Sequence, residues 1–300
     1  MVEYVHADSL PALRQPTLIA AFAGWNDAGE SATMAVRIIR RQRRGQQFAH
    51  IEPEEFFVFT ETRPTVRLTD GATRKIEWPA TEFYACVHTD AASDLVLLLG
   101  TEPQLRWQTF TAAVMGLAHK LGVQQIITLG SLLADVPHTR PAPISGGSPD
   151  PALAARLADL NVRNSNYEGP TGIIGVLNAQ SARTGVPAAS LWASAPHYLQ
   201  AQPNPMVALS LLQRLDSLLD LELDLLRLEA RAKSFLRQVD EAVGEHPEIR
   251  DYVHRLEERT AEGEDAQPSD SGDLPSGEAL VEELERFLRR SRSQDEGTQE

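Results

Sequence analysis

The chain has 300 residues, of which 42% are hydrophobic and 23% are charged. These values lie near the averages of globular proteins, so they exclude a disordered or fibrous protein for most of the chain. The longest wholly apolar run, Leu18 to Ala23, is too short for a membrane-spanning helix. Residues 1–16 do not show the basic stretch followed by an apolar stretch that is typical of a secretory signal. The one cysteine, Cys86, allows no internal disulfide. We therefore expect a cytoplasmic protein that has no membrane partner.

The net charge of −14 argues against a nucleic-acid partner, because affinity for phosphate backbones depends on clustered basic side chains. The acidity is concentrated toward the C-terminus. Residues 1–200 hold 16 basic and 18 acidic side chains, residues 201–260 hold 8 and 12, and residues 261–300 hold 4 and 12.

The first 200 residues alternate short apolar runs with helical patterns, which is typical of a mostly parallel sheet covered by helices. The predicted strands are residues 18–23, 55–60, 83–88, 94–99, 125–129, 171–176 and 188–193. The predicted helices among them are residues 31–41, 104–121 and 177–184, and residues 135–151 form a long loop. These elements predict a three-layer α/β sandwich over residues 1–203.

The composition changes in the last third of the chain. Residues 206–243 contain neither glycine nor proline, and their leucines keep a helical spacing at positions 212, 215, 219, 223 and 226. This pattern predicts one long helix, unless the helix breaks near Ala232. A second amphipathic helix follows over residues 249–256, so residues 204–260 are predicted to form a helical hairpin.

The C-terminal end divides into three predicted segments. Residues 261–277 are acidic and rich in Ser, Gly and Pro, which indicates a flexible linker. Residues 278–290 have the spacing of an amphipathic helix, which either docks on the body or binds a partner. Residues 291–300 are predicted to be a disordered tail.

No strongly specific catalytic motif occurs in the sequence. Walker A, GxGxxG, HExxH, CxxC and GxSxG patterns are all absent, and Gly29-Glu30-Ser31-Ala32-Thr33 lacks the second glycine of a nucleophile elbow. No two of the eight histidines lie four residues apart on one helix with a third ligand nearby. We therefore predict no catalytic residue, no cofactor and no metal.

Polar and aromatic side chains gather where the predicted strands end. In open α/β sheets, ligands bind beyond the carboxyl ends of the strands. The turn of residues 24–29, the loop of residues 100–103 and the loop of residues 135–141 all follow predicted strands. The candidate ligand-binding residues are Trp25, Asn26, Asp27, Glu102, Trp107, Asp135, His138, Arg140 and His197.

A structural role is the alternative for each of these loops. Trp25 could pack on the sheet while Asp27 caps the helix that follows. Glu102 could cap the start of a helix. Asp135 and His138 could belong to a hydrogen-bonded loop network rather than to a catalytic dyad. The sequence leaves these alternatives open.

Five segments of the sequence together resemble the PAC2 family, and its actinobacterial members in particular. The resemblance covers roughly residues 17–290, including the leucine-rich helices. Its segments are residues 18–29, Gly100-Thr101-Glu102-Pro103 with Trp107 and Phe110, residues 134–141, Tyr167-Glu168-Gly169-Pro170-Thr171-Gly172-Ile173, and residues 190–198.

The resemblance implies a fold similar to purine nucleoside phosphorylases and a tendency to self-associate, with a trimer as our guess. For relatives in eukaryotes and archaea, the resemblance implies binding to proteasome subunits. Archaeal chaperones of this kind can carry a C-terminal hydrophobic-Tyr-any tail that docks in the proteasome ring. The last residues here, Gly297 to Glu300, depart from that pattern, so we do not expect tail-mediated docking.

Two functions follow from the sequence. The first is a non-enzymatic, oligomeric protein-interaction or assembly factor whose partners include proteasome-related subunits. The second is a nucleoside- or nucleotide-binding protein, or a hydrolase or phosphorylase, that uses the strand ends. In that case Trp25 or Trp107 would stack on the base, His138 would act as acid or base, and Arg106 and Arg140 would be the nearby cations for a phosphate.

Overall fold

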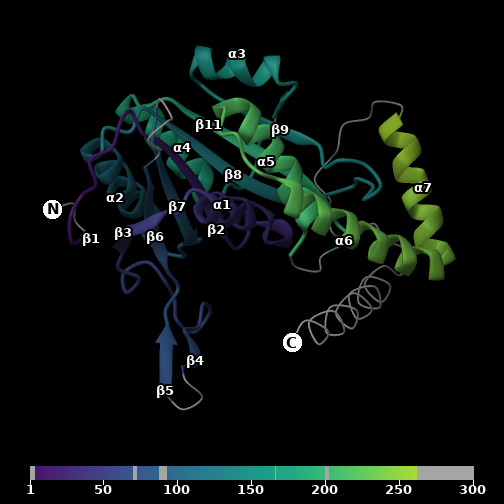
Figure 1. The fold of residues 1–300 in the computed structure, drawn as a ribbon, viewed down its shortest axis with the longest axis horizontal. Helices are drawn as coiled ribbons and strands as arrows, with labels where there is room; N and C mark the ends of the chain where they lie inside the picture. The colour runs from purple at the N-terminus through teal and green to yellow at the C-terminus, as the bar shows by residue number, and fades with distance from the viewer. Residues whose placement is uncertain (1–3, 70–72, 88–92, 166, 200–202, 262–300) are drawn as a thin grey trace.

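A nine-stranded mixed sheet forms the centre of the molecule (Figure 1). The computed structural model describes residues 4–69, 73–87, 93–165, 167–199 and 203–261. In spatial order the strands are β1 (Val5–Ala7), β3 (Gln46–Ile51), β6 (Thr81–Cys86), β7 (Leu95–Thr101), β2 (Thr17–Ala23), β8 (Gln125–Ala134), β11 (Ala188–Pro196), β9 (Ile144–Gly147) and β10 (Arg163–Asn164).

The central strands β7, β2, β8 and β11 are mutually parallel, so their carboxyl ends meet at one edge of the sheet. On one side of these strands, β6 pairs antiparallel with β7, β3 pairs antiparallel with β6, and β1 pairs antiparallel with β3. On the other side, β9 pairs antiparallel with β11 and parallel with β10. The continuous apolar runs of β2 and β7 suit central strands that are covered on both faces.

Helices cover both faces of the sheet (Figure 1). Their bounds are η1 (Ala28–Glu30), α1 (Ser31–Gln42), α2 (Trp107–Lys120), α3 (Pro151–Asp159), α4 (Ile173–Thr184), α5 (Pro205–Leu219), α6 (Leu226–Glu245) and α7 (Pro247–Ala261). Helices α1, α3 and α5 share a core with Ile19 and Ala21 of β2. Helices α2 and α4 share a second core with Leu18 and Phe22. The alternation of side chains along β2 thus supplies both cores, as the predicted sandwich requires.

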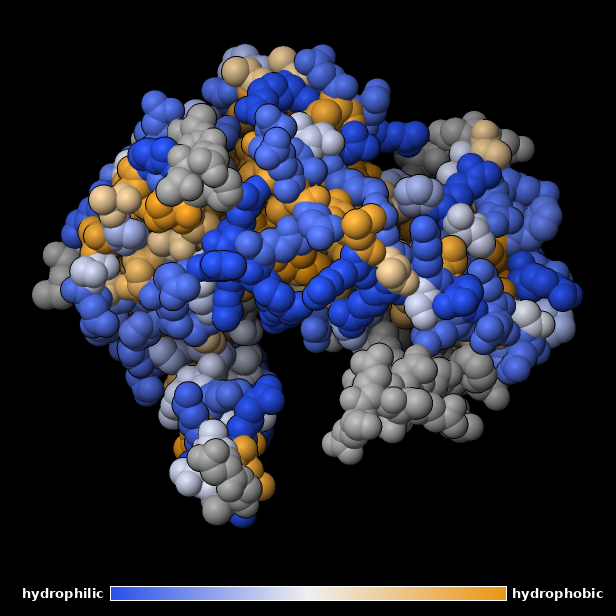
Figure 2. Space-filling model, viewed as in Figure 1, coloured by the Kyte–Doolittle hydropathy of each residue, from blue (hydrophilic) through white to orange (hydrophobic). Residues whose placement is uncertain are grey.

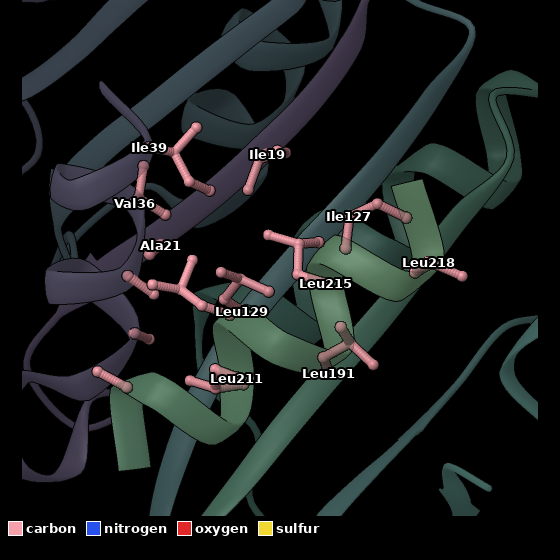
Figure 3. Close-up of a cluster of buried hydrophobic side chains, with 14 of the residues drawn as sticks. Ile19, Ala21, Val36, Ile39, Ile127, Leu129, Leu191, Leu211, Leu215 and Leu218 are labelled. Atoms are coloured by element: carbon pink, nitrogen blue, oxygen red, sulfur yellow. The ribbon is translucent and has the colours of Figure 1, made fainter. Parts of the chain in front are cut away.

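Helix α5 belongs to the body and lies directly on the sheet (Figure 3). Its fully buried leucines point toward side chains of β8 and β11, and α1 packs beside it. The residues of α5 in this cluster are Val207, Ala208, Leu211, Leu212, Leu215 and Leu218. Leu212 and Leu215 of the leucine stripe read from the sequence lie in this contact surface, and Leu219 and Leu223 pack against it, whereas Leu226 is exposed.

The predicted long helix is interrupted at residues 220–225, not near Ala232. Asp220 has a φ of 52°, in the left-handed region, and it ends α5. The carboxylate of Asp216 then accepts a hydrogen bond from the backbone N–H of Leu223 at 3.2 Å. Tertiary contacts set this break, since the side chain of Gln42 in α1 both accepts from and donates to the main chain of Asp224.

Several strand predictions differ from the structure. The aromatic run of residues 55–60 is a loop, because Phe56 and Phe57 turn into the core rather than pair along a sheet. Residues 171–176 begin α4, since a short apolar run does not distinguish a strand from a buried helix. Strands β3 and β9 were not predicted. The sequence of β3 is polar and shows no apolar pattern, and β9 lies inside the predicted loop of residues 135–151.

Helices α6 and α7 contact each other and form a third apolar cluster against the end of β11. This cluster contains Tyr198, Leu199, Phe235, Val239, Ala242, Val243, Ile249, Val253 and Leu256. Across the described ranges, α6 and α7 included, every helix is too short or too polar to cross a membrane. The predicted linker 261–277, helix 278–290 and tail 291–300 lie outside the described residues, apart from Ala261 at the end of α7.

Strands β4 (Thr65–Thr69) and β5 (Thr73–Glu77) form a separate antiparallel pair that projects from the body (Figure 1). We call this pair the β4–β5 arm. All ten of its strand residues are exposed. At its base, the rings of Phe59 and Trp78 meet edge to face at 4.8 Å.

Candidate functional site

The carboxyl edge of the central strands carries the polar side chains predicted from the sequence. Asn26 and Asp27 follow β2, and Glu102 follows β7. Asp135 and His138 follow β8, and His197 follows β11. Since these strands are parallel neighbours, the topology places all of these residues at one edge.

A first group, which we call the Glu102 cluster, consists of Asn26, Glu102, Gly172 and Ile173. The Oε1 atom of Glu102 accepts a hydrogen bond from Asn26 Nδ2 at 2.6 Å and another from the backbone N–H of Ile173 at 2.8 Å. Glu102 thus joins the ends of β2 and β7 to the first turn of α4. A negative charge at a helix start also interacts favourably with the helix dipole.

Gly172 allows this close approach. A methyl group at its Cα would lie 2.3 Å from Asn26 Oδ1 and 2.7 Å from Glu102 Oε1, so any larger residue would displace them. Asn26 is fully buried, and its Oδ1 atom has no hydrogen-bond partner among the described residues.

Asp27 acts as the helix cap proposed among the structural alternatives. Its buried carboxylate accepts hydrogen bonds from the backbone N–H of Ala32 at 2.7 Å and from the Thr33 hydroxyl at 2.5 Å. Burial raises the pKa of this carboxyl, while the hydrogen bonds from Thr33 and Ala32 oppose the rise. Its oxygens are therefore already used by the first turn of α1.

We expect Asp27→Ala to lower the free energy of unfolding by about 1–3 kcal/mol, because it leaves buried donors of Ala32 and Thr33 without an acceptor. Urea denaturation followed by circular dichroism measures this change. Asp27→Asn keeps one acceptor oxygen and should lose less. Equal stability of Asp27→Ala and the wild type would contradict the capping role.

The two candidate stacking residues lie differently. Trp25 is 64% exposed, so it does not pack on the sheet as the structural alternative expected. Trp107 is half-buried, and its ring N–H donates to the backbone oxygen of Pro103 at 2.5 Å. Arg106 pairs with Glu55 and lies over the ring of Tyr4, so its charge already has a partner.

A second group, which we call the His–Tyr cluster, consists of His138, His197, Tyr198 and Tyr252. Tyr198 is its centre, with ring centroids 5.7 Å from His138, 5.6 Å from His197 and 6.2 Å from Tyr252, all edge to face. Tyr252 lies on α7, so the cluster joins the ends of β8 and β11 to the helical pair α6–α7.

Hydrogen bonds orient His138 within this cluster. The Tyr198 hydroxyl accepts from the backbone N–H of His138 at 2.8 Å and lies 2.7 Å from its Nδ1 atom. The Nε2 atom lies 3.1 Å from Oδ1 of Asp240 on α6. A neutral ring with its proton on Nε2 satisfies this arrangement, because Tyr198 then donates to Nδ1 and Nε2–H donates to Asp240.

Carboxylates from the loop after β8 and from helix α7 lie around the cluster. Asp135 contacts His197 Nδ1 at 3.2 Å and the guanidinium of Arg259 at 3.8 Å. Burial, together with the charge of Asp135, raises the pKa of Tyr252 to about 12. The Thr139 hydroxyl donates to Glu257 of α7 at 2.5 Å. Asp135 and His138 thus belong to a loop network that fastens α6 and α7.

Burial lowers the pKa of His138, while Asp240 and Glu257 partly oppose this effect. The folded state therefore favours the neutral ring, and the unfolded chain, with a pKa of about 6.5, binds a proton first as the pH falls. This contribution to stability is complete above that value and is lost as the pH drops below it. We expect the unfolding temperature to fall between pH 7.5 and pH 5.5.

The fall should be smaller in His138→Gln than in the wild type. Differential scanning fluorimetry over that pH range measures the difference. His254→Gln is the matched control, because His254 is an exposed residue of α7 paired only with Glu258 among the contacts seen here. An identical pH slope in the wild type and in His138→Gln would contradict the assignment.

The structure places five of the nine predicted residues in two separate contact groups, and Trp25, Asp27, Trp107 and Arg140 belong to neither group. Asn26 contacts Glu102, whereas Asp135, His138 and His197 lie in or against the His–Tyr cluster. Exposed Arg140 borders a cavity beside His138 that measures about 10 Å³, room for about one water molecule. No group of three potential metal ligands occurs in the described ranges.

Tyr198, Tyr252 and Asp240 are important residues that the sequence analysis did not select. Tyr198 directly follows His197 in one of the family-like segments, which was an available signal. The apolar spacing of α7 includes Tyr252, but a spacing does not show which strand end a helix covers. Nothing in the sequence pairs Asp240 with His138, which stands 102 positions earlier.

The PAC2 family model matches residues 21–243 of this chain. The chain belongs to the PAC2 family. A PAC2 family protein from Streptomyces avermitilis shares 43% sequence identity, covers 79% of this chain and 99% of its own, and has a TM-score of 0.72. A proteasome-assembly chaperone homologue from Mycobacterium tuberculosis shares 38% identity with the same coverage and TM-score.

An archaeal proteasome activator from Pyrococcus furiosus has a TM-score of 0.63 at 19% identity over 79% of this chain and 98% of its own, which shows the fold alone. A search of curated proteins finds no match. These comparisons confirm the predicted family and the mixed α/β fold of this PAC2 protein. The likeness to purine nucleoside phosphorylases stays a prediction.

Proposed function

We propose that this PAC2 protein is a non-enzymatic, oligomeric assembly factor whose partners are proteasome-related subunits in the cytoplasm. The observation that carries the proposal is its 38% identity, over 79% of the chain, to the proteasome-assembly chaperone homologue of Mycobacterium tuberculosis. The trimer guessed from the family resemblance belongs to the same proposal.

The contacts at the strand ends support a binding protein over an enzyme. Glu102 is hydrogen-bonded to Asn26 and Ile173, and the carboxylate of Asp27 is used by α1. His138 lies between Tyr198 and Asp240. Side chains committed to such internal contacts hold strands and helices together, whereas a general acid or base must reach a substrate.

Reconstitution with the proteasome α- and β-subunits of the same organism tests the partner. The protein is mixed with each purified subunit and with both, and native mass spectrometry identifies the complexes. We expect a stable complex with at least one subunit and faster appearance of assembled particles. Absence of any complex at micromolar concentrations, together with unchanged assembly kinetics, would overturn the proposed partner.

A nucleoside panel tests the non-enzymatic part. A ligand that binds the folded state raises its stability and therefore its unfolding temperature. We expect neither turnover nor such a thermal shift with nucleosides or nucleotides at millimolar concentration. Turnover that is lost in Glu102→Gln or His138→Gln would overturn this part and favour the rival enzyme.

A further inference from the structure

The β4–β5 arm has one apolar face and one polar face. Val66 pairs with Ile76 across the two strands, and Leu68 lies two residues along on the same face. These side chains are 57%, 53% and 63% exposed. The other face carries Arg67 opposite Lys75 and is also exposed. Figure 2 shows hydrophobic and hydrophilic side chains together on the surface of the projecting arm.

This alternation is the pattern of a strand pair with one buried face, but no described residue of the chain buries it. Among the described residues, ten large hydrophobic side chains are exposed, and four of them lie between Val66 and Trp78. An isolated two-stranded hairpin is only marginally stable in water, whereas a covered apolar face stabilises it. The arm therefore has the composition of an interaction surface.

Charge indicates what covers the arm. Its two strands carry three basic side chains and one acidic one, in a chain whose net charge is −14. Arg74 lies directly opposite Leu68, on the apolar face. A matching surface would combine exposed apolar side chains with carboxylates.

The chain itself carries such a surface at residues 220–226, which we call the α5–α6 elbow. Leu226 is 73% exposed, the largest exposure among the described large hydrophobic residues. The exposed acidic residues Asp220, Glu222 and Asp224 precede it within six positions. The elbow is held in place by the two hydrogen bonds between Gln42 and the main chain of Asp224.

The arm and the elbow leave the sheet at opposite edges. The arm leads into β6, whose first residue, Thr81, pairs with Gly100 at the carboxyl end of β7. The elbow is bound to Gln42 at the end of α1, just before β3 starts at Gln46 beside Ala85. Ala85 pairs with Val96 near the amino end of β7. The arm of one molecule therefore does not reach its own elbow, and the elbow that it contacts must belong to a second molecule.

We propose that the apolar face of the β4–β5 arm docks on the α5–α6 elbow of a second copy of this chain. Two different surfaces meet in such a contact, so it repeats from copy to copy and closes into a ring where the rotation permits. The inference rests on the self-association in the proposed function. It adds the surfaces that mediate it.

A charge exchange tests this contact. The arm variant carries Arg74→Glu, which lies on the apolar face, and the elbow variant carries Glu222→Lys. Size-exclusion chromatography with light scattering should show each variant alone as a 33.0 kDa monomer. A chain that carries both substitutions should recover the wild-type oligomer. Lys120→Glu, an exposed change at the end of α2, is the control and should stay oligomeric.

Cysteine cross-linking identifies the two surfaces directly. Leu68→Cys and Leu226→Cys are made in separate chains, with the native Cys86 buried in the core. Under mild oxidation, a mixture of the two variants should give covalent dimers, whereas each variant alone should give none. Dimers from Leu68→Cys alone would show arm-to-arm pairing and would overturn the proposal.

The outcomes separate this contact from the proposed function. A wild-type oligomer that survives both charge variants would overturn the arm–elbow contact and leave self-association standing. A monomeric wild type would overturn both. Dissociation of the oligomer with retained binding of proteasome subunits would support the contact and show that the subunits use another surface.

Discussion

Replacing Leu215 with alanine is expected to lower the free energy of unfolding by about 3–5 kcal/mol. Leu215 is fully buried and lies where α5 faces the sheet, pointing toward Ile127 and Leu129 of β8 (Figure 3). Truncation removes apolar contacts and leaves a cavity, because the flanking strands have little freedom to collapse. Urea denaturation of the wild type and the variant measures the difference.

Gln213→Ala is the matched control, since Gln213 is an exposed residue of the same helix. Alanine has a high helix propensity, so this control should change stability by no more than about 0.5 kcal/mol. If Leu215→Ala were no less stable than the control, α5 would not belong to the body as described. The result thus separates a packed helix from a projecting one.

Replacing Tyr198 with alanine is expected to cost about 3–5 kcal/mol and to release α6 and α7 from the strand ends. Tyr198 is 3% exposed and contacts His138, His197 and Tyr252 at once. Loss of its ring removes the centre of the His–Tyr cluster. Hydrogen exchange with mass spectrometry should show faster exchange in α6 and α7 than in the sheet, because local stability depends on such contacts.

Tyr198→Phe separates the ring from the hydroxyl. It keeps the edge-to-face contacts but leaves the backbone N–H and Nδ1 of His138 without their partner, which should cost about 1–3 kcal/mol. Exchange in α6 and α7 should then stay close to the wild type. Equal effects of the two variants, or unchanged exchange in Tyr198→Ala, would contradict the central role of the ring.

The docked helices connect this cluster to the proposed oligomer. Helix α6 begins at Leu226, which is also the exposed apolar residue of the elbow. Asp240, further along α6, contacts His138. The elbow is therefore held from α1 through Gln42 and from the strand ends through α6, so that a second copy would meet a preformed surface.

The comparison of sequence and structure follows a physical division. Residues 18–23 and 94–99 were predictable as strands because a central parallel strand is apolar throughout. The same reasoning failed at residues 55–60, where the aromatic side chains cover the core from a loop. The polar strand β3 gave no signal, because its place in the sheet comes from backbone pairing with β1 and β6.

Composition and local periodicity were enough to predict an α/β body and polar residues at the carboxyl ends of neighbouring strands, and five short segments indicated the family by resemblance, because each of these depends on short stretches of chain. The division of those residues into the Glu102 cluster and the His–Tyr cluster depends on contacts with Ile173 and Tyr252, from helices far along the chain. The same is true of the turn at Asp220, which Gln42 holds through Asp224. Such contacts link residues distant in sequence, and no local pattern records them.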